Sequence, residues 1–370
     1  MSTTKPVVVY GASGYTGRLV CEYLREYGLP FVAAGRDAGR VQQVMDSLPG
    51  IETADYEVAA VEHTVDALTE LFTGASVVCN MVGPFADLGG EVVQACLNAG
   101  CHYTDTNGEQ NWMLAAQKEF ADKFEESGLL IAPGIAQMYT TGEIAANYAL
   151  ETPGIDSLDI LVLWKGAPTT ASTETIFTNL LSEAYYLENN EYVEWPPPQG
   201  YEVAMPGQHV TALTLPWGGT SHPVWFKDDH RVRNARVLGG VFNRELMEGV
   251  VQISQMVHEQ IKPLPLEEAK AALAEQAAAM KAEMPPRENQ LYNLSIDSVY
   301  GMGPLAQVHV LIKGTCNYKQ TGLLQAYVAH RLVNGKPDVT GFGSACQAFG
   351  HRELFSMLKS FGLVADPVIT

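Results

Sequence analysis

The segment Val7–Arg18 (VVVYGASGYTGR) constrains the fold of this chain more than any other stretch of its sequence. An apolar, strand-like run leads into helix-spaced residues, and Gly11, Gly14 and Gly17 lie between the two. In a dinucleotide-binding turn the first glycine allows a tight turn, the second lets the backbone approach the pyrophosphate, and the third lets the helix lie close to the strand. The helix N-terminus then presents free N–H groups to the phosphates. The residues predicted to bind the cofactor here are Gly11, Ala12, Ser13, Gly14, Tyr15, Thr16 and Gly17.

Strand-like and helix-like patterns alternate over residues 1–135, which predicts a parallel sheet with helices on both faces. The predicted strands are Pro6–Tyr10, Phe31–Ala34, Tyr56–Val61, Ala75–Val82, His102–Thr106 and Leu129–Ala132. The predicted helices are Tyr15–Tyr27, Val65–Phe72, Gly90–Leu97 and Trp112–Phe124. This part is therefore expected to form a doubly wound Rossmann domain.

The pattern changes after about Thr152, where longer strands of a second sheet are expected. These strands are Leu158–Trp164, Val210–Leu215, Leu294–Tyr300 and Gln307–Gly314, with helices at Thr173–Leu187, Arg244–Glu259 and Glu267–Ala282. Two last helices, Leu323–Leu332 and Glu353–Phe361, are expected to pack back onto the first domain. For the 370 residues we expect a Rossmann domain (1–150), an α+β substrate or dimerisation domain (151–322) and returning C-terminal helices (323–370).

The end of the second predicted strand indicates which dinucleotide is bound. An NAD enzyme usually places an acid there to hold the ribose 2′-hydroxyl, whereas this chain has Arg36 first and Asp37 after it. An arginine can pair with a 2′-phosphate, and Arg40 one turn later is a second candidate. The other interpretation is a solvated Arg36 and an Asp37 that caps the next helix. We therefore predict NADP(H) as the cofactor.

Ligands of an open parallel sheet bind beyond the carboxyl ends of the strands, so three loops are candidates for the reaction site. In the first, Gly83 and Pro84 are predicted to shape a turn under the cofactor; Asn80 and Val82 are also assigned to cofactor binding, although Asn80 can equally end a strand. The third loop carries Tyr139, a candidate proton donor or simply a buried tyrosine.

The second loop carries two carboxylates, Asp105 and Glu109. Catalysis by proton transfer or substrate orientation is one role for them, and bonding to ribose or within the loop is another. For Glu109 a third role is to cap the helix expected near Trp112. His102, within a predicted strand, is expected to be structural.

Charge and motifs exclude several classes of protein. The formal charge of −19 argues against nucleic acid or an anionic membrane as partner. No apolar run approaches the ~20 residues that span a bilayer, and no signal peptide is evident, so a cytoplasmic protein is expected. None of the 16 tyrosines has a lysine four positions later, and no HExxH spacing occurs, so neither a short-chain dehydrogenase dyad nor a metal site is expected. The six scattered cysteines are expected to be buried thiols.

The segments GASGYTG, AAGRD and CNMVGPFADLGGEVVQACLNAGCHYTDTNGE resemble the saccharopine dehydrogenase-like NADP-binding proteins, and within them the trans-acting enoyl reductase branch. The likeness continues at Leu215–Gly219, Gly314–Tyr318 with Thr321, and Ala348–Gly350. One departure is Gly341–Cys346 (GFGSAC), where many relatives have a proline. The resemblance implies a Rossmann domain interrupted by an α+β domain, and NADPH-dependent reduction of a C=C, C=N or C=O bond.

Aromatic residues of the second domain suit a pocket for a hydrophobic small-molecule substrate, although most buried aromatic residues simply belong to a core. They are Trp164, Phe177, Tyr185, Tyr186, Trp195, Trp217, Trp225 and Phe226. The leading prediction is an NADPH-dependent oxidoreductase that reduces a C=C or C=O bond of such a substrate. The alternatives are an amino-acid-type C–N dehydrogenase or imine reductase, and a non-catalytic NADP(H)-sensing protein. A homodimer is one way to cover the exposed edge of the second sheet.

Overall fold

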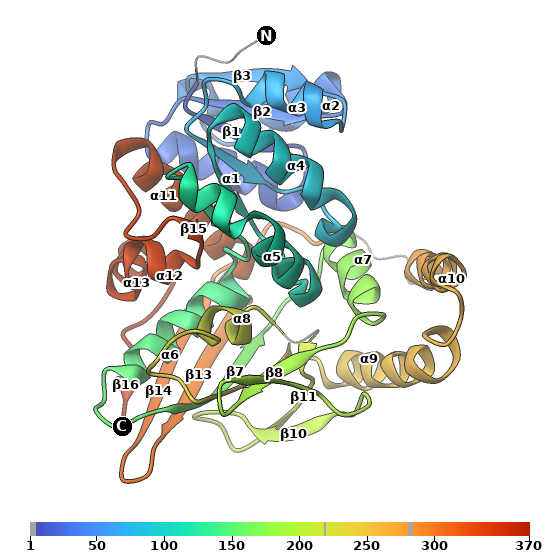
Figure 1. Cartoon of the computed structure of the whole chain (residues 1–370), viewed down its shortest axis with the longest axis vertical. Coiled ribbons are helices and arrows are strands. Elements are labelled where there is room, and N and C mark those ends of the chain that lie inside the picture. The colour runs from blue at the N-terminus through green and yellow to red at the C-terminus, as the bar shows by residue number, and fades with distance from the viewer. Residues whose placement is uncertain (1–4, 218–219, 280–283) are drawn as a thin grey trace. The chain divides into compact units, whose positions relative to one another are not determined.

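The computed structural model describes residues 5–217, 220–279 and 284–370. The chain forms two compact units (Figure 1). Unit 1 comprises residues 1–107, 112–140 and 318–358, and unit 2 comprises residues 108–111, 141–317 and 359–370. The second unit is thus inserted into the first, as the sequence predicts. The predicted domain ranges 1–150, 151–322 and 323–370 stay a prediction.

Unit 1 contains a seven-stranded parallel sheet with the order β15-β6-β5-β4-β1-β2-β3. Its strands are β1 (Val7–Tyr10), β2 (Phe31–Gly35), β3 (Tyr56–Ala60), β4 (Val77–Asn80), β5 (His102–Asp105), β6 (Leu130–Ala132) and β15 (Gly341–Phe342). The six predicted strands and the doubly wound fold class are confirmed. The strand order reverses between β1 and β4, so the crevice for a ligand opens where these two strands end.

The added seventh strand β15 was not predicted. It lies in the segment Gly341–Cys346 that departs from the relatives, and it pairs in parallel with β6 through Gly341 and Phe342. Two residues are too few to show a period of two, and Gly341 has a φ of +76°. The hydrogen bond from Gly341 N to Leu129 O, at 2.8 Å, fixes its register instead.

The helices of unit 1 are α1 (Tyr15–Glu26), α2 (Ala38–Asp46), α3 (Val65–Phe72), α4 (Phe85–Ala99), α5 (Gln110–Glu126), α11 (Asn317–Asn334), α12 (Ala345–Phe349) and α13 (His351–Ser360). Helix α4 begins five residues before the predicted Gly90. Gly89 and Gly90 interrupt the helical spacing of apolar residues, so the sequence pattern does not show the first turns of this helix. A Cβ on Gly89 would lie 2.5 Å from the ring of Trp112, so glycine is needed for α4 to approach α5.

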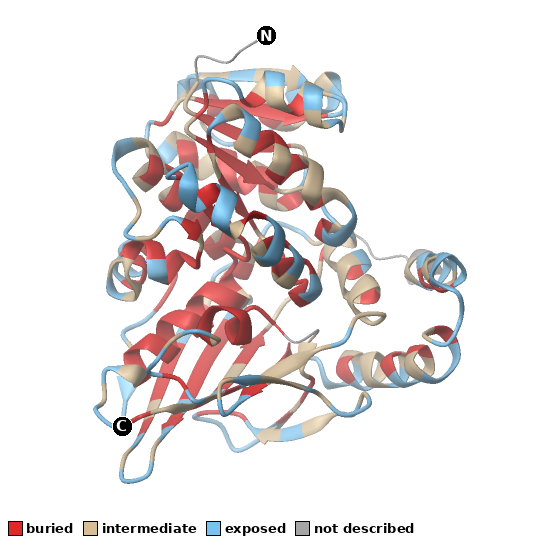
Figure 2. Ribbon diagram, viewed as in Figure 1, coloured by how far each residue is buried: buried red, intermediate tan, exposed pale blue. Residues whose placement is uncertain are grey.

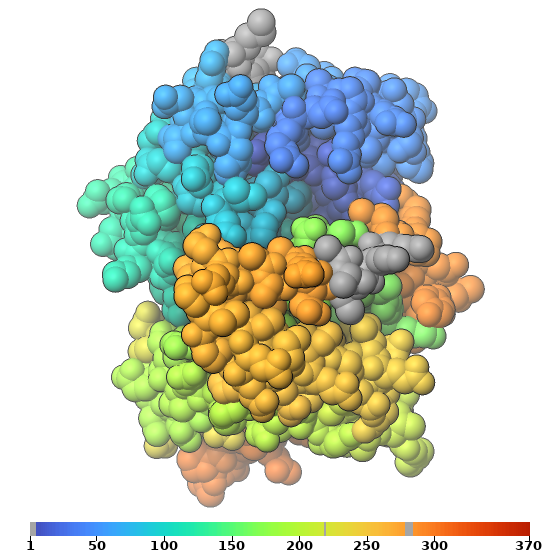
Figure 3. All heavy atoms as spheres, turned by 90° about the vertical axis from the view of Figure 1, so that its right-hand side faces the viewer, coloured from blue at the N-terminus to red at the C-terminus, as the bar shows by residue number. Residues whose placement is uncertain are grey.

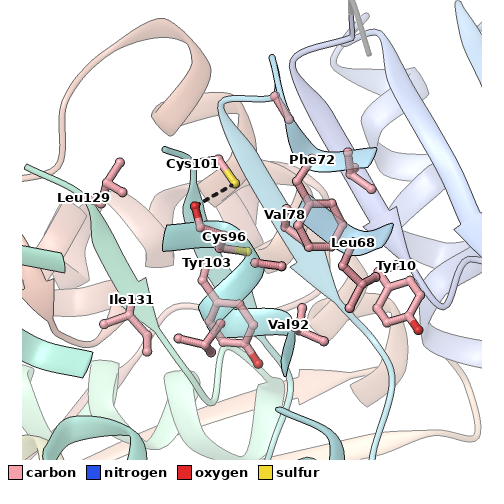
Figure 4. Close-up of a cluster of buried hydrophobic side chains, with 14 of the residues drawn as sticks. Tyr10, Leu68, Phe72, Val78, Val92, Cys96, Cys101, Tyr103, Leu129 and Ile131 are labelled. Carbon is pink, nitrogen blue, oxygen red and sulfur yellow. Dashed lines mark hydrogen bonds between the residues drawn. The ribbon is translucent and has the colours of Figure 1, made fainter. Parts of the chain in front are cut away.

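The core of unit 1 packs apolar side chains of the strands against α3, α4 and α5 (Figures 2 and 4). Tyr10 of β1 contacts Phe72 edge-on at a centroid distance of 6.5 Å. Cys101 donates its thiol to the Cys96 carbonyl at 3.6 Å. All six cysteines lie in the described part of the chain, and each is free and buried, as predicted.

Helix α11 returns to the Rossmann sheet and contacts the helix of the glycine-rich turn. A Cβ on Gly322 would lie 2.8 Å from the Leu19 Cβ, so α11 and α1 touch at a glycine. The Gln325 side chain accepts a bond from Thr104 Oγ1 (2.7 Å) and donates to the carbonyls of Asp105 (2.6 Å) and Ile135 (2.9 Å). The predicted return of the C-terminal helices is confirmed.

Unit 2 contains a mixed seven-stranded sheet with the order β16-β14-β13-β7-β12-β8-β9, and a separate hairpin β10-β11. Its strands are β7 (Ser157–Trp164), β8 (Tyr185–Glu188), β9 (Glu191–Glu194), β10 (Tyr201–Ala204), β11 (Thr211–Thr214), β12 (Asn234–Val241), β13 (Leu294–Met302), β14 (Gln307–Thr315) and β16 (Val368–Ile369). Its helices are α6 (Gly142–Leu150), α7 (Thr170–Asn179), α8 (His222–Phe226), α9 (Arg244–Met256) and α10 (Leu266–Ala279), and a π-helical turn, Val257–Ile261, continues α9.

Two predictions for unit 2 were wrong. The predicted helix Thr173–Leu187 ends at Asn179, because Tyr185–Glu188 forms a hairpin with β9. Asn189 and Asn190 both have positive φ (52° and 58°), which is the backbone of a two-residue hairpin turn. The predicted strand Val210–Leu215 exists as β11, but it pairs with β10 outside the large sheet.

Residues 280–282 of the predicted helix Glu267–Ala282 lie outside the described residues, as do Gly218 and Gly219 of the segment Leu215–Gly219. Among the helices that are described, none is both long enough and apolar enough to cross a membrane. The predicted cytoplasmic location stays a prediction.

Candidate functional site

The glycine-rich turn has the geometry that a dinucleotide requires. Gly11 has a φ of +92°, and a Cβ there would lie 2.9 Å from Val82 Cγ2. A Cβ on Gly17 would lie 2.2 Å from the Gly11 carbonyl oxygen, so α1 can begin this close to β1 only with glycine. Gly14 is exposed, and only that same carbonyl oxygen lies within 4 Å of a Cβ placed on it, at 3.3 Å. The open approach at Gly14 is the space that a pyrophosphate would need.

Two arginines at the end of β2 are available to a 2′-phosphate. Arg36 and Arg40 are exposed, and neither forms an ion pair with any residue that the structure describes. Asp37 accepts a hydrogen bond from Arg40 N at 3.1 Å and caps α2, so its carboxylate serves the helix. The capping role considered for Asp37 is therefore observed, and the acid is not in the position that selects NAD.

The loop after β4 is held by hydrogen bonds of the Asn80 side chain, one to the loop itself and one to Tyr103 of the neighbouring strand β5. Asn80 is fully buried; its Oδ1 accepts from Val82 N at 3.0 Å, and its Nδ2 donates to Tyr103 Oη at 3.1 Å. Gly83 is exposed and Pro84 precedes α4. The amide of Asn80 is thus committed to shaping the turn that the sequence assigned to the cofactor.

Asp105 is the centre of a buried hydrogen-bond network at the carboxyl ends of β5 and β6. Its Oδ1 accepts from Asn107 N (2.9 Å), Asn107 Nδ2 (2.6 Å) and Gly134 N (2.8 Å). Its Oδ2 accepts from Tyr103 Oη (2.7 Å) and Trp112 Nε1 (3.3 Å). A carboxylate has about four lone-pair positions, so five donors occupy it fully. Among the roles considered for Asp105, this geometry favours organising the loop.

Burial and hydrogen bonding have opposing effects on the pKa of Asp105. Complete burial raises the pKa of this carboxyl above its usual value, and the bonds from Asn107, Gly134 and Tyr103 act in the opposite direction. The same burial raises the pKa of Tyr103 well above the normal range of a phenol, and the Asp105 charge adds to the rise. Tyr103 therefore stays a donor, which keeps Asn80 and Asp105 linked through one phenol.

The other two predicted catalytic residues are both buried. Tyr139 is 9% exposed and lies in the π-helical turn Gln137–Thr141, which follows the loop after β6. Glu109 is fully buried and directly precedes α5. Asp105 and Tyr139 belong to unit 1, whereas Glu109 belongs to unit 2. The catalytic roles of the three stay predictions.

Two buried polar residues of unit 2 were not predicted. Gln110 is 1% exposed. Its Nε2 donates to the backbone oxygens of Tyr185 (3.0 Å) and Thr220 (3.0 Å), and its Oε1 accepts from Tyr185 N (2.7 Å). His222 is fully buried, and a Cβ on Gly142 would lie 2.6 Å from its Nε2. No sequence spacing marks either residue as part of a site, because Tyr185 and Thr220 are distant from Gln110 in the chain and Gly142 is distant from His222.

Unit 2 also contains a pocket of about 180 Å³. Two of the eight aromatic residues expected in a pocket line it, Trp195 and Trp217, together with the prolines Pro196–Pro198 and Pro216. Trp164, Phe177, Trp225 and Phe226 are instead buried, at no more than 5% exposed. The segment Glu194–Pro198 (EWPPP) thus forms a wall of this pocket.

Residues 7–131 match the saccharopine dehydrogenase NADP binding domain, and residues 140–370 match a family of unknown function, DUF5938. The first match confirms the predicted resemblance and the predicted cofactor, NADP(H). The Rossmann unit described above supplies the fold that this cofactor needs.

Three curated relatives carry names that bear on function. The lipid droplet localized protein of Caenorhabditis elegans is 32% identical over 38% of this chain and 35% of its own length. The saccharopine dehydrogenase-like oxidoreductase of Homo sapiens is 31% identical over 34% of this chain and 32% of its own. The trans-acting enoyl reductase of Mycobacterium ulcerans is 35% identical over 28% and 25%. The chain therefore spans about a third of the length of the curated relatives it matches, or less.

Two solved structures cover nearly the whole chain. A myo-inositol dehydrogenase from Corynebacterium glutamicum covers 98% of both chains at 8% identity and a TM-score of 0.43. The putative oxidoreductase yvaA from Bacillus subtilis covers 97% of this chain and 98% of its own at 11% identity and a TM-score of 0.38. The family models carry the assignment: this chain belongs to the family of unknown function DUF5938, preceded by a saccharopine dehydrogenase NADP-binding domain.

Proposed function

We propose that this chain is an NADPH-dependent oxidoreductase that reduces a C=C or C=O bond of a hydrophobic small molecule. The observation that carries the proposal is the glycine-rich turn, in which Gly11 and Gly17 have no room for a Cβ and Gly14 opens to solvent. The names of the curated relatives, oxidoreductase and enoyl reductase, support the reaction class. The pocket of unit 2 supports an apolar substrate through its tryptophan and proline walls.

When bound, NADPH supplies a hydride, which adds with one proton across the double bond and leaves NADP⁺. The residues of the chain would bind the cofactor and orient it. The turn at Gly11–Gly17 and the N-terminus of α1 would hold the pyrophosphate, and Arg36 and Arg40 would hold the 2′-phosphate. Ala12, Ser13, Tyr15 and Thr16 line the same turn. Asn80, Val82, Gly83 and Pro84 form the loop at the point where the strand order reverses.

For the proton, we propose Tyr139 as donor and assign Asp105 a positioning role. The five donors on Asp105 leave it no free lone pair for a substrate, and they fix the loops after β5 and β6. Tyr139 follows the second of these loops, in a π-helical turn, a feature common at functional sites. Glu109 retains two candidate roles, orientation of the substrate and capping of α5.

The test is a titration with NADPH and with NADH, followed by cofactor fluorescence, of the native chain and of Arg36→Ala. We expect NADPH to bind more tightly than NADH. Loss of the arginine should raise the Kd for NADPH about 10- to 100-fold and leave NADH unchanged, because only NADPH carries the 2′-phosphate. Arg244→Ala, at an exposed site of unit 2, is the matched control and should leave both constants unchanged.

Each result has a consequence. NADPH binding that depends on Arg36 justifies a screen of enones, ketones and imines, and turnover of imines alone would favour the C–N dehydrogenase. NADPH binding without turnover of any class would favour an NADP(H)-sensing protein. Binding of neither nucleotide would overturn the redox proposal.

A further inference from the structure

We infer that the pocket of unit 2 is a binding site for a small aromatic carboxylate, a single ring with one acidic group. The inference deepens the proposed function by naming the class of ligand, and it rests on that function only for the ligand's fate as a substrate. The pocket lies entirely within unit 2, among α7, the end of β9, the segment after β11, and α9. Helices α9 and α10 occupy the face of the molecule shown in Figure 3 (yellow to orange).

The walls of the pocket are apolar and stiff. Trp195 follows β9 and is braced by Tyr186, with ring centroids 4.8 Å apart, and by Tyr201 at 5.9 Å. Pro196–Pro198 follow directly, and proline fixes φ, so this wall loses little freedom when a ligand binds. Trp217, in the segment after β11, has a φ of +52°, which is an uncommon backbone conformation for a non-glycine residue. Such walls favour a flat apolar ring.

The size of the pocket limits the ligand. An apolar cavity of about 150 Å³ accepts benzene. The pocket here measures about 180 Å³, which leaves room for one ring and a short substituent. The polar part of the ligand must then reach the polar groups of the lining.

One face of α9 and of the turn after it lines the pocket, and its side chains change from apolar to cationic along the helix. Val250, Ser254, His258 and Lys262 are spaced by four residues along α9 and the π-helical turn after it, and all four line the pocket. The spacing places them on one face, apolar at Val250 and cationic at Lys262. Ser254 donates its hydroxyl to Val250 O at 2.8 Å, which leaves the next two residues as the polar end.

The cationic end is held in place from the other side of the helix. Val257 and Ile261 of the same turn are buried in a cluster with Phe177, Ala269 and Leu273. The bond from Lys262 N to Val257 O, at 2.8 Å, spans five residues and closes the π-helical turn. His258 and Lys262 are therefore fixed at their backbones before any ligand binds.

The side chains of these two residues have no partner in the described part of the chain. Neither the His258 imidazole nor the Lys262 ammonium forms a hydrogen bond or ion pair with residues 5–217, 220–279 or 284–370. The lining also contains two acids, Glu183 and Glu194. Glu183 accepts the Tyr185 hydroxyl at 2.5 Å, and both acids are exposed to water. The half-buried, unpaired ammonium of Lys262 therefore favours a carboxylate, because water screens the charges of the two exposed acids more strongly.

The test uses three probes that share one ring: phenylacetate, 2-phenylethanol and phenethylamine. Binding is measured by calorimetry without NADPH, on the full chain. We expect phenylacetate to bind about tenfold more tightly than the alcohol, and the amine to bind most weakly, because the ammonium of Lys262 attracts only the first. Equal affinity for the three probes, tighter binding of the amine, or no binding of phenylacetate would overturn the inference.

Two variants assign the effect to the pocket. Lys262→Met keeps an apolar stem of similar length and should abolish the preference for phenylacetate while leaving the alcohol within about twofold. Trp195→Leu should weaken all three probes. Lys336→Met, at an exposed lysine of unit 1, is the control and should change nothing. A preference that survives Lys262→Met would place the carboxylate elsewhere and would contradict the proposal.

Failure of this inference can be told from failure of the proposed function. NADPH binding that depends on Arg36, together with no preference for phenylacetate, overturns the ligand class alone. A preference for phenylacetate without NADPH binding overturns the redox function alone. Where both bind, oxidation of NADPH on addition of an unsaturated aromatic acid identifies a substrate, and its absence identifies a ligand that is not reduced.

Discussion

At the carboxyl ends of β4 and β5 in unit 1, Asn80, Tyr103 and Asp105 bond to one another and to backbone groups. In the pocket of unit 2, the side chains of His258 and Lys262 have no such partner among the described residues. Both regions place polar groups beside apolar surface. In the first the polar groups satisfy each other and fix the loops, and in the second they remain available to a ligand. Burial of a polar side chain therefore marks architecture when its bonds are complete, and marks a candidate site when they are not.

The strongest way to test this comparison is Asp105→Ala. The substitution leaves the N–H groups of Asn107 and Gly134 and the side chains of Tyr103 and Trp112 buried without their acceptor. We expect the free energy of unfolding, measured by urea denaturation at pH 7, to fall by about 3 to 5 kcal/mol. Asp37→Ala, which removes an exposed helix cap, is the control and should cost ~1 kcal/mol.

Equal losses for the two aspartates would contradict the structural role of Asp105. If the alanine variant does not fold, Asp105→Asn retains the volume and one acceptor oxygen. The loss for Asp105→Asn should still exceed that of the control, because its amide NH2 faces donors that a carboxylate oxygen would accept.

The next effect comes from the glycines of the cofactor turn. Gly17→Ala should lower the free energy of unfolding by ~2 kcal/mol and abolish NADPH binding, because its Cβ would lie 2.2 Å from the Gly11 carbonyl oxygen. Gly14→Ala meets that oxygen only at 3.3 Å, so stability should change by no more than ~0.5 kcal/mol while NADPH binding weakens. Thermal denaturation and NADPH titration measure the two properties separately. Equal destabilisation by both alanines would show that α1 can move away from β1.

Gln110→Leu tests whether the pocket of unit 2 depends on the hydrogen bonds that Gln110 forms with Tyr185 and Thr220. The leucine leaves the N and O of Tyr185 and the O of Thr220 without their partner. The free energy of unfolding should fall by ~2 kcal/mol. Phenylacetate should also bind more weakly, because Tyr185 follows Ala184, a residue of the pocket wall. Gln117→Leu in the same helix α5 is the control. Unchanged binding of phenylacetate in Gln110→Leu would separate this network from the pocket.

The smallest effect concerns pH. Burial lowers the pKa of His102 to about 4, and its Nδ1 accepts a bond from Leu130 N at 2.9 Å. Since the unfolded chain binds this proton near pH 6.5, the stability that the neutral ring contributes is complete above pH 6.5 and is lost as pH falls toward 4. His102→Asn keeps an acceptor without the titration, so the loss of unfolding free energy between pH 7 and 4.5 should shrink by about 1 to 2 kcal/mol.

The control for this pH effect is His209→Asn, at an exposed histidine, which should show the same loss as the native chain. An unchanged loss in His102→Asn would assign the acid sensitivity of the protein to other groups.

Local patterns in the sequence predicted most of unit 1. Most of its six predicted strands contain apolar runs, and Gly17 of the first turn is required by a contact only six residues away, with the Gly11 carbonyl oxygen. The start of α4 was missed because Gly89 and Gly90 interrupt the helical pattern, and Gly89 is required by a ring distant in the sequence, that of Trp112. The strand β15 was missed because two residues carry no period.

Unit 2 was less predictable because its strands pair at long range. Strand β12 pairs in parallel with β7 over eight residue pairs that are separated by 77 positions in the chain. The hairpin β8–β9 depended on two asparagines in a left-handed conformation, and the sequence pattern there favoured a longer helix. Of the eight aromatic residues expected in a pocket, only the fold could separate the two that line it from those that form the core.

The sequence by itself determined the Rossmann class, the glycine-rich turn and the choice of NADP(H), because each depends on neighbours along the chain. The tertiary structure alone decided which polar residues are satisfied. Asp105 and Lys262 are both charged side chains near apolar segments, and nothing in their local sequence tells them apart. The five donors to the first come from strand β5, the loops after β5 and β6, and helix α5, and none of the described residues pairs with the second, because the fold brings together the partners of a buried charge.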